Sequence, residues 1–253
     1  MSVSVARVVA RNKYHLDGRD VVRNEPIFVQ LPRRETGCLS YVVADPQTRR
    51  AAVVDPPQDL APILSAVAAQ RLHVDAVVET HTHADHLSGA RRLASHAQAR
   101  LVLPERSPAA FPYEKLADGG DFRVGDLRLR ALATPGHTPD AMTLVLADRA
   151  LVGDTLLPGT AGRADFYEGG IEEMYHSLFD RLLRLSDDLL VYPAHYGAKH
   201  GLPEKLFTTI GDERRSNEAL TQATKEDFVR YMTEGWPEKP HGWREIVAAN
   251  TRE

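Results

Sequence analysis

This chain has very little cysteine and no long apolar run. Its 253 residues contain one cysteine, Cys38, which excludes a disulfide bond within the chain. No window approaches the roughly 20 consecutive apolar residues of a membrane-spanning helix, so we expect no membrane as partner. The formal net charge of −4 gives no reason to expect a nucleic acid as partner.

The N-terminal residues 1–11 also lack the apolar segment of a secretory signal, because Arg7 and Arg11 interrupt them. We therefore expect a cytoplasmic protein. The alternative is an organelle transit peptide, for which Arg7, Arg11 and the serines are suitable but the stretch is short. No low-complexity linker or repeat divides the chain. We expect a single domain over residues 1–253, in which residues 200–253 form a helical extension. Cys38 lies in an apolar run, and we interpret it as a small buried hydrophobic residue.

Strand and helix patterns alternate along the chain. Short apolar runs predict strands at 3–9, 27–31, 38–44, 51–54, 74–78, 100–103, 122–133 (with a hairpin turn at 124–127), 142–147, 150–152 and 189–192. Apolar residues at helical spacing predict helices at 60–70, 90–97, 171–185, 205–220 and 225–234. Residues 107–120 show no strong periodicity, and we expect a loop there. The sum favours an α/β fold with four layers, two sheets between two layers of helices.

Metal-ligand side chains crowd into six residues, His81-Thr-His-Ala-Asp-His86, directly after an apolar strand. In an extended chain, residues two apart point the same way, so His81 and His83 could face one ion together. Asp85 and His86 would lie just before the next helix. A lone histidine is more often an ordinary surface or core residue, but four ligand residues at this spacing indicate a metal site.

Three further candidates each follow a predicted strand. They are His137 in Pro-Gly-His-Thr, Asp154 in Gly-Asp-Thr and His195 in Pro-Ala-His. The carboxyl ends of strands are the usual place for a site in α/β proteins. Gly136 and Gly153 precede two of the candidates, and we expect both in conformations that a side chain would forbid. The other histidines show no such setting and are expected at the surface or in packing: His15, His73, His96, His176, His200 and His241.

Taken in order, these motifs resemble those of the metallo-β-lactamase superfamily. The resemblance rests on residues 81–86, 135–138, 153–154 and 193–195, and it covers about residues 25–200. It implies a four-layer αββα sandwich with a metal site at one edge of the two sheets.

The seven candidate ligands leave two chemistries open. In the first, as in hydrolases such as glyoxalase II, two zinc ions share them and Asp154 bridges the ions. One ion then takes His81, His83 and His137, and the other takes Asp85, His86 and His195. A bridging hydroxide would attack the carbonyl of a glutathione thioester or another ester. In the second, His81, His137 and Asp154 form a two-histidine, one-carboxylate triad, which suits one Fe(II) ion and dioxygen.

The segment after Asp154 resembles the persulfide dioxygenases of this superfamily. Gly162-Arg-Ala-Asp-Phe166 matches their G-R-x-D-F run, and residues 208–217 match their T-I-x-x-E-R-R-x-N pattern. Glyoxalase II typically carries a G-R-F-F-E-G type run and a long helical domain that binds glutathione, for which residues 196–253 are short. The resemblance thus implies oxidation of glutathione persulfide, or a similar low-molecular-weight persulfide, by O2 to sulfite and thiol.

In this reading one Fe(II) ion per chain binds His81, His137 and Asp154. The remaining ligand candidates would hold a second metal or orient the iron ligands and water: His83, Asp85, His86 and His195. Of these, Asp85 and His195 are expected to be catalytic.

Arg163 and Tyr196 are expected to bind the substrate. Arg163 could hold an anionic group as a planar fork, although an ion pair with Asp165 or Glu168 is the alternative. The dioxygenases often have P-A-H-D-Y after the last strand, whereas Tyr196 follows His195 directly, and their G-C-G-R cysteine is Ala161 here.

The resemblance also implies a homodimer. Trp236 and Trp243 are a candidate interface, and the alternative is that both pack on the core of their own chain.

Overall fold

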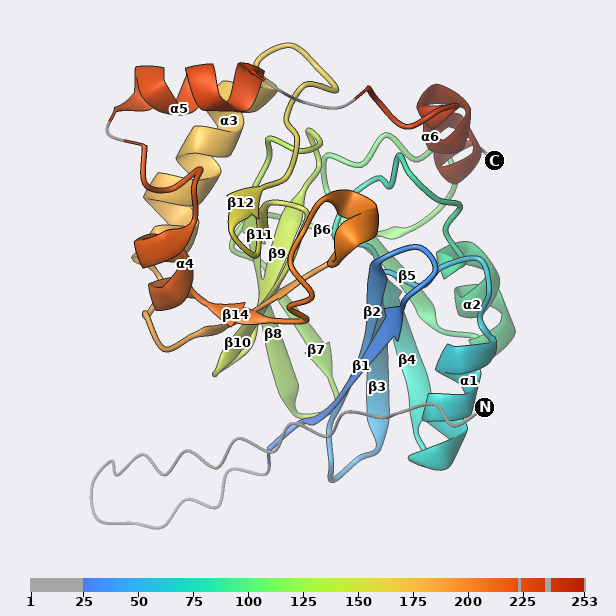
Figure 1. Ribbon diagram of the computed structural model, residues 1–253. Helices are drawn as coiled ribbons and strands as arrows, with labels where there is room; N and C mark the ends of the chain where they lie inside the picture. Colours follow the sequence, from blue (N-terminus) through green and yellow to red (C-terminus); the bar gives the residue numbers. More distant parts are fainter. Residues whose placement is uncertain (1–24, 223, 235–237, 253) are drawn as a thin grey trace, which may run out of the picture.

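Two six-stranded sheets form the centre of the computed structural model, which describes residues 25–222, 224–234 and 238–252 (Figure 1). The first sheet contains, in spatial order, β1 Ile27–Arg33, β2 Cys38–Ala44, β3 Arg50–Val54, β4 His73–Val78, β5 Arg100–Pro104 and β6 Glu114–Leu116. The second contains β14 Thr208–Thr209, β13 Leu190–Pro193, β10 Arg149–Gly153, β9 Met142–Val145, β8 Leu127–Ala133 and β7 Asp121–Val124. A separate hairpin pairs β11 Leu156–Leu157 with β12 Thr160–Ala161. The strand expected at 3–9 lies outside the described residues.

Helices cover the outer face of each sheet (Figure 1). The first sheet carries α1 Ala61–Ala69 and α2 Ala90–Ala97. The second carries α3 Gly170–His176, α4 Ile210–Ser216 and α5 Lys225–Thr233. The last helix, α6 Trp243–Thr251, lies on the same side of the molecule as α2 (Figure 1). The four-layer αββα sandwich is therefore confirmed, while the single domain of residues 1–253 stays a prediction.

Three apolar clusters hold the layers together. The central one fills the space between the sheets, with Tyr41 and Val54 on one side and Phe122 and Leu151 on the other. Two outer clusters join each sheet to its helices. Fully burying one such side chain contributes about 1.5–3 kcal/mol, so these clusters set how the strand ends meet.

Several predicted elements need correction. The loop expected at 107–120 contains β6, which pairs with β5 and extends the sheet edge. β1 does not end at Pro32 but runs to Arg33, because an edge strand leaves the missing N–H of proline without consequence. The helix at 171–185 loses its regular form after α3, where a π-helical turn at Ser177–Arg181 and a 3-10 turn at Leu182–Arg184 follow. α6 was not predicted.

Among the described residues, no helix has both the length and the apolar character needed to cross a membrane.

The site forms where strand ends of both sheets converge. β10 and β13 are parallel, so the residues after them emerge at the same edge. Backbone hydrogen bonds tie the first sheet to this edge: Leu39 N donates to Ala194 O at 2.7 Å, and Met142 N donates to Thr80 O at 2.8 Å.

Candidate metal centre

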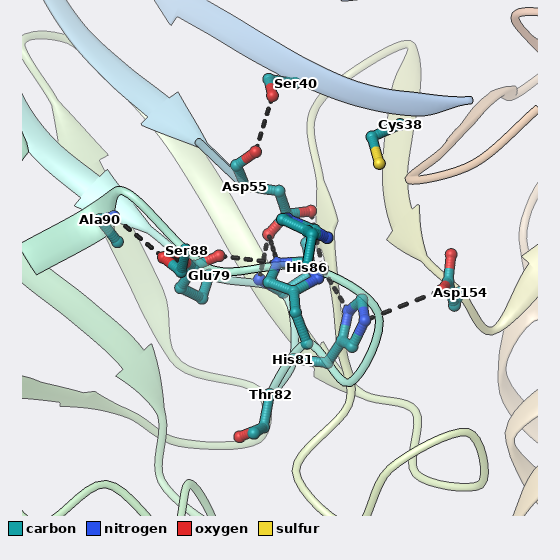
Figure 2. Close-up of polar contacts among 12 residues, drawn as sticks. Cys38, Ser40, Asp55, Glu79, His81, Thr82, His86, Ser88, Ala90 and Asp154 are labelled. Atoms are coloured by element: carbon teal, nitrogen blue, oxygen red, sulfur yellow. Dashed lines mark hydrogen bonds and ion pairs between the residues drawn. The ribbon is translucent and has the colours of Figure 1, made fainter. Parts of the chain in front are cut away.

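Three buried ligand atoms meet at this edge. His81 follows β4, His137 lies between β8 and β9, and Asp154 follows β10. One ligand atom of each lies within 4.8 Å of the other two. His81 Nε2 lies 3.8 Å and His137 Nε2 3.5 Å from Asp154 Oδ2. Figure 2 shows the His81 ring directed toward Asp154. The structure thus brings together the two-histidine, one-carboxylate set that the sequence predicts.

The proton position on His81 follows from its neighbours. Asp55 accepts hydrogen bonds from Thr80 N at 2.7 Å and from Thr80 Oγ1 at 2.8 Å. Because the threonine hydroxyl has donated its proton to Asp55, it accepts from Nδ1–H of His81 at 2.9 Å. Nε2 of His81 therefore carries a lone pair, and within the described chain this buried atom has no hydrogen-bond partner. Burial and the nearby His83 lower the pKa of His81 well below its ordinary value, which favours the neutral, metal-binding ring.

His137 is oriented in the same way by a backbone group. Its Nδ1 donates to the carbonyl of Arg163 at 2.8 Å, and a carbonyl can only accept. Nε2 of His137 is therefore the atom free to bind a metal. Nε2 of His81 and Nε2 of His137 both face Asp154, and each carries a lone pair. The residues present therefore fit a metal ion.

The glycines beside these ligands confirm the prediction made for them. Gly136 has φ +144°, and a Cβ there would lie 2.5 Å from Met174 Cα. Gly153 has φ +55°, and a Cβ there would lie 2.7 Å from Thr80 Oγ1. A side chain at Gly136 would push the His137 loop away from α3, and one at Gly153 would push the Asp154 loop away from Thr80.

His195 connects Asp154 to Asp85. Its Nδ1 lies 2.7 Å from Asp154 Oδ1, and its Nε2 lies 2.9 Å from Asp85 Oδ2. Burial alone would lower the pKa of His195, but the two carboxylates raise it well above its ordinary value. Burial raises the pKa of Asp154, yet His195 outweighs that effect and holds it far below the usual range. His195 is therefore an imidazolium that lies between the carboxylates of Asp154 and Asp85.

One ring nitrogen of His83 is held by two carboxylates. Its Nε2 lies 2.9 Å from Glu79 Oε2 and 3.5 Å from Asp55 Oδ1, both of them buried. These carboxylates outweigh the effect of burial and raise the pKa of His83 well above its ordinary value. The expectation that His81 and His83 face one ion stays a prediction, because their ring centroids lie 4.2 Å apart and Nδ1 of His83 has no hydrogen-bond partner within the described chain. β4 ends at Val78, and the residues that follow form a loop rather than extended chain.

A second group of ligand atoms lies beside the first. His83, Asp85 and His86 each offer one atom within 4.8 Å of the other two. Asp85 Oδ1 and His86 Nδ1 are 3.0 Å apart. This group and His195 are the residues expected to hold a second metal or to orient the first, and their positions beside the triad suit both roles.

The predicted substrate residues have structural partners. Arg163 donates from Nε to Asp165 Oδ1 at 2.8 Å and from Nη2 to Asp165 Oδ2 at 3.1 Å, which is the ion pair foreseen as the alternative. Its side chain also donates to Glu238 O at 3.2 Å. Tyr196 is buried in the cluster between the sheets. Substrate binding by either residue stays a prediction.

Cys38 is buried, as predicted, but it is not in an apolar setting. Its Sγ lies 4.0 Å from Asp85 Oδ2, and one atom each of Cys38, Asp85, His195 and His200 form a cluster. Burial raises the pKa of Cys38, but hydrogen bonds from His195 and His200 outweigh it and lower the pKa to about 5. His200, expected to serve only surface or packing roles, is exposed yet contributes to this cluster.

Sequence reasoning missed the residues that orient the ligand loops. Asp55 and Glu79 come from strand ends without a motif, and Asp140 accepts from Thr82 Oγ1 at 2.6 Å. Asp55 directly follows an apolar strand, just as Asp154 does, and that signal could have singled it out.

Comparison with known proteins agrees with this geometry. The family model described as metallo-beta-lactamase superfamily matches residues 33–195. The chain belongs to the metallo-beta-lactamase superfamily. Within it, the chain is 32% identical to the persulfide dioxygenase ETHE1, mitochondrial, of Homo sapiens, over 100% of this chain and 97% of the relative. The crystal structure of ETHE1 from Myxococcus xanthus, also 32% identical, superposes with a TM-score of 0.80 over 89% of this chain and 96% of that chain.

A hydrolase of the same superfamily is also similar. The hydroxyacylglutathione hydrolase of Pseudoalteromonas translucida is 35% identical over 73% of this chain and 69% of the relative. The likeness to the persulfide dioxygenases therefore extends further along the chain, and it includes the C-terminal residues.

Proposed function

We propose that the protein is an Fe(II)-dependent persulfide dioxygenase. The observation that carries the proposal is the buried triad of His81, His137 and Asp154, beside which Nε2 of His83 is occupied by Asp55 and Glu79. Two histidines and one carboxylate with open positions suit Fe(II) and O2. The full-length similarity to proteins named persulfide dioxygenase supports the same reading.

The proposed substrate is glutathione persulfide or a similar low-molecular-weight persulfide. The reaction balances as RSSH + O2 + H2O giving RSH, sulfite and two protons. A single Fe(II) ion on the triad would supply redox activity and open positions where the persulfide sulfur and O2 can meet. The carrier thiol is proposed from the resemblance, with Arg163 and Tyr196 as the residues that would contact it.

The protein's own groups hold this centre in place. Thr80 and the Arg163 carbonyl fix the two histidine rings through their Nδ1 atoms. The cationic His195 keeps Asp154 ionised and oriented. In the proposal His195 and Asp85 also accept and pass on the protons released with sulfite, because His195 Nε2 and Asp85 Oδ2 are hydrogen-bonded at 2.9 Å.

A second candidate is a dinuclear zinc hydrolase of a glutathione thioester or related ester. The cluster of His83, Asp85 and His86 beside the triad favours it, as does the similarity to a hydroxyacylglutathione hydrolase. It needs an ion at Nδ1 of His83, a buried atom that has no hydrogen-bond partner within the described chain, so Nε2 can keep its contact with Glu79. It also predicts turnover without oxygen.

The cytoplasmic location, the homodimer and the absence of nucleic acid as a partner remain part of the proposal. The mammalian relatives are named as mitochondrial. Trp243 packs against Phe166 of its own chain at 5.2 Å between ring centroids, and Trp236 lies outside the described residues. Light scattering of the purified protein distinguishes a dimer from a monomer.

Oxygen consumption tests the dioxygenase. An oxygen electrode with iron-loaded protein and glutathione persulfide should show uptake matched by sulfite. In the variant Asp154→Ala the rate of oxygen uptake should fall by at least about 100-fold, because removing a triad residue removes the metal. Absence of uptake by the iron-loaded wild type, together with anaerobic thioester hydrolysis, would overturn the proposal.

A further inference from the structure

One side chain of the C-terminal helix α6 makes three hydrogen bonds to the metal loop. Asn250 Nδ2 donates to His83 O at 3.0 Å and to His86 O at 3.0 Å. Asn250 Oδ1 accepts from Ser88 N at 3.0 Å. The amide thus contacts three backbone groups of residues 83–88, the loop that carries Asp85.

We propose that Asn250 is a positioning residue that holds this loop in its ligand-bearing shape. The carbonyls of His83 and His86 point to one amide nitrogen, so the loop must curl around it. Residues 81–86 belong to no strand pair, and backbone pairing resumes only where Leu87 O accepts from Gln58 N at 3.0 Å and Ser88 forms a β-bridge with Pro57. Side-chain amides are suited to this task because one group donates twice and accepts at once.

The helix that carries Asn250 is itself fastened on both sides. Ala110 N donates to Thr251 O at 2.7 Å, and Arg91 Nη1 donates to Arg252 O at 2.8 Å. At the other end of α6, Trp243 packs on Phe166 at 5.2 Å, and Phe166 packs on the ring of His137 at 5.4 Å. α6 therefore touches the surroundings of both ligand loops, and it lies beside α2 (Figure 1).

The opposite side of the loop is held by a separate contact. Ser88 Oγ donates to Glu79, and both residues are drawn in Figure 2. The Glu79 carboxylate also binds His83. Ser88 thus donates to Asn250 from its backbone N–H and to Glu79 from its hydroxyl. Loss of Asn250 would release the loop from α6 while the Glu79 contact remained, so the fold should persist.

Two variants and a control separate positioning from general stability. Asn250→Ala removes all three bonds. Asn250→Asp keeps an acceptor for Ser88 N but has no donor for the two carbonyls. Glu245→Gln changes an exposed residue of the same helix. Amide hydrogen exchange of residues 83–88 in the metal-free protein and chelator-driven release of bound metal are the readouts, with Fe(II) and Zn(II) loaded in parallel.

Asn250→Ala and Asn250→Asp should both raise the rates of amide exchange in residues 83–88 and of metal release by about tenfold or more, because each variant loses both donated hydrogen bonds to the loop. Glu245→Gln should match the wild type. The inference fails if Asn250→Asp behaves like the wild type, or if exchange rises equally in the core strands. It rests on the proposed function only in treating the loop as a metal loop. The Zn(II) arm tests it even if the iron dioxygenase is wrong.

Discussion

At the scale of single residues, the site is decided by which nitrogen of each histidine is free. Thr80 and the Arg163 carbonyl take the Nδ1 protons of His81 and His137. His195 instead faces a carboxylate at both nitrogens. The same side chain therefore presents an unprotonated nitrogen in two places and is a cation in the third.

The variant His195→Gln tests whether the positive charge of His195 supports the site. Gln cannot carry the positive charge that keeps Asp154 ionised, so metal affinity or kcat should fall by about 10–100-fold, as is typical for groups that orient ligands. Chelator competition and oxygen uptake measure the two quantities. His176→Gln, which changes an exposed histidine paired with Asp180, is the matched control. Equal behaviour of the two variants would contradict the assigned role.

Cys38 should titrate far from an ordinary thiol. The charge and hydrogen bonds of its histidine neighbours outweigh burial and give a pKa of about 5, so the thiolate should be present above that pH and lost below it. Thiolate absorbance of the metal-free wild type minus that of Cys38→Ser measures this titration. A midpoint near pH 8 to 9, the ordinary value for cysteine, would show that His195 is not the cation described above.

The ligand triad could be predicted from the sequence, but its support could not. Each of the three ligands follows a strand inside a short motif, which makes it recognisable without a structure. The supporting hydrogen bonds join residues far apart: Asp55 and Thr80 are 25 positions apart, and Ser88 and Asn250 are 162 apart. No local pattern carries such pairings.

At the scale of elements, the pattern that begins at Thr208 has a structural purpose. The buried Glu213 accepts from Thr208 Oγ1 at 2.7 Å, from Gly159 N at 2.8 Å and from Asn217 Nδ2 at 2.6 Å. Asn217 in turn donates to Leu157 O at 3.1 Å. α4 thereby fixes the β11–β12 hairpin, which directly follows the metal aspartate.

Glu213→Ala should lower the free energy of unfolding by about 3 kcal/mol, because three donors lose a charged acceptor and two of them are side chains in a buried site. Urea denaturation measures it. Arg215→Ala in the same helix removes only an exposed ion pair with Asp212 and should stay within about 0.5 kcal/mol of the wild type. Similar losses for both variants would show that Glu213 is not the anchor of this hairpin.

The sequence predicts an element well where its residues are buried and poorly where they are exposed. Strands with continuous apolar runs, such as β2 and β3, were predicted within a residue because the core decides them. β6 was missed because only one of its three residues is buried. α6 was missed because none of its residues is fully buried, so its apolar pattern is weak even though Asn250 lies on it.

At the scale of the whole molecule, the two sheets supply different parts of one centre. β4 carries the histidine loop, and β8, β10 and β13 of the second sheet carry His137, Asp154 and His195. The triad is complete only when the sheets pack face to face. Asn250 of the C-terminal helix then contacts the loop, which places α6 beside the site.

The metal content of the protein after oxygen-free purification tests the central claim most directly. With Fe(II) and Zn(II) both supplied, the account predicts one iron per chain and oxygen uptake with glutathione persulfide. Two zinc ions per chain, with thioester hydrolysis in the absence of oxygen, would contradict it.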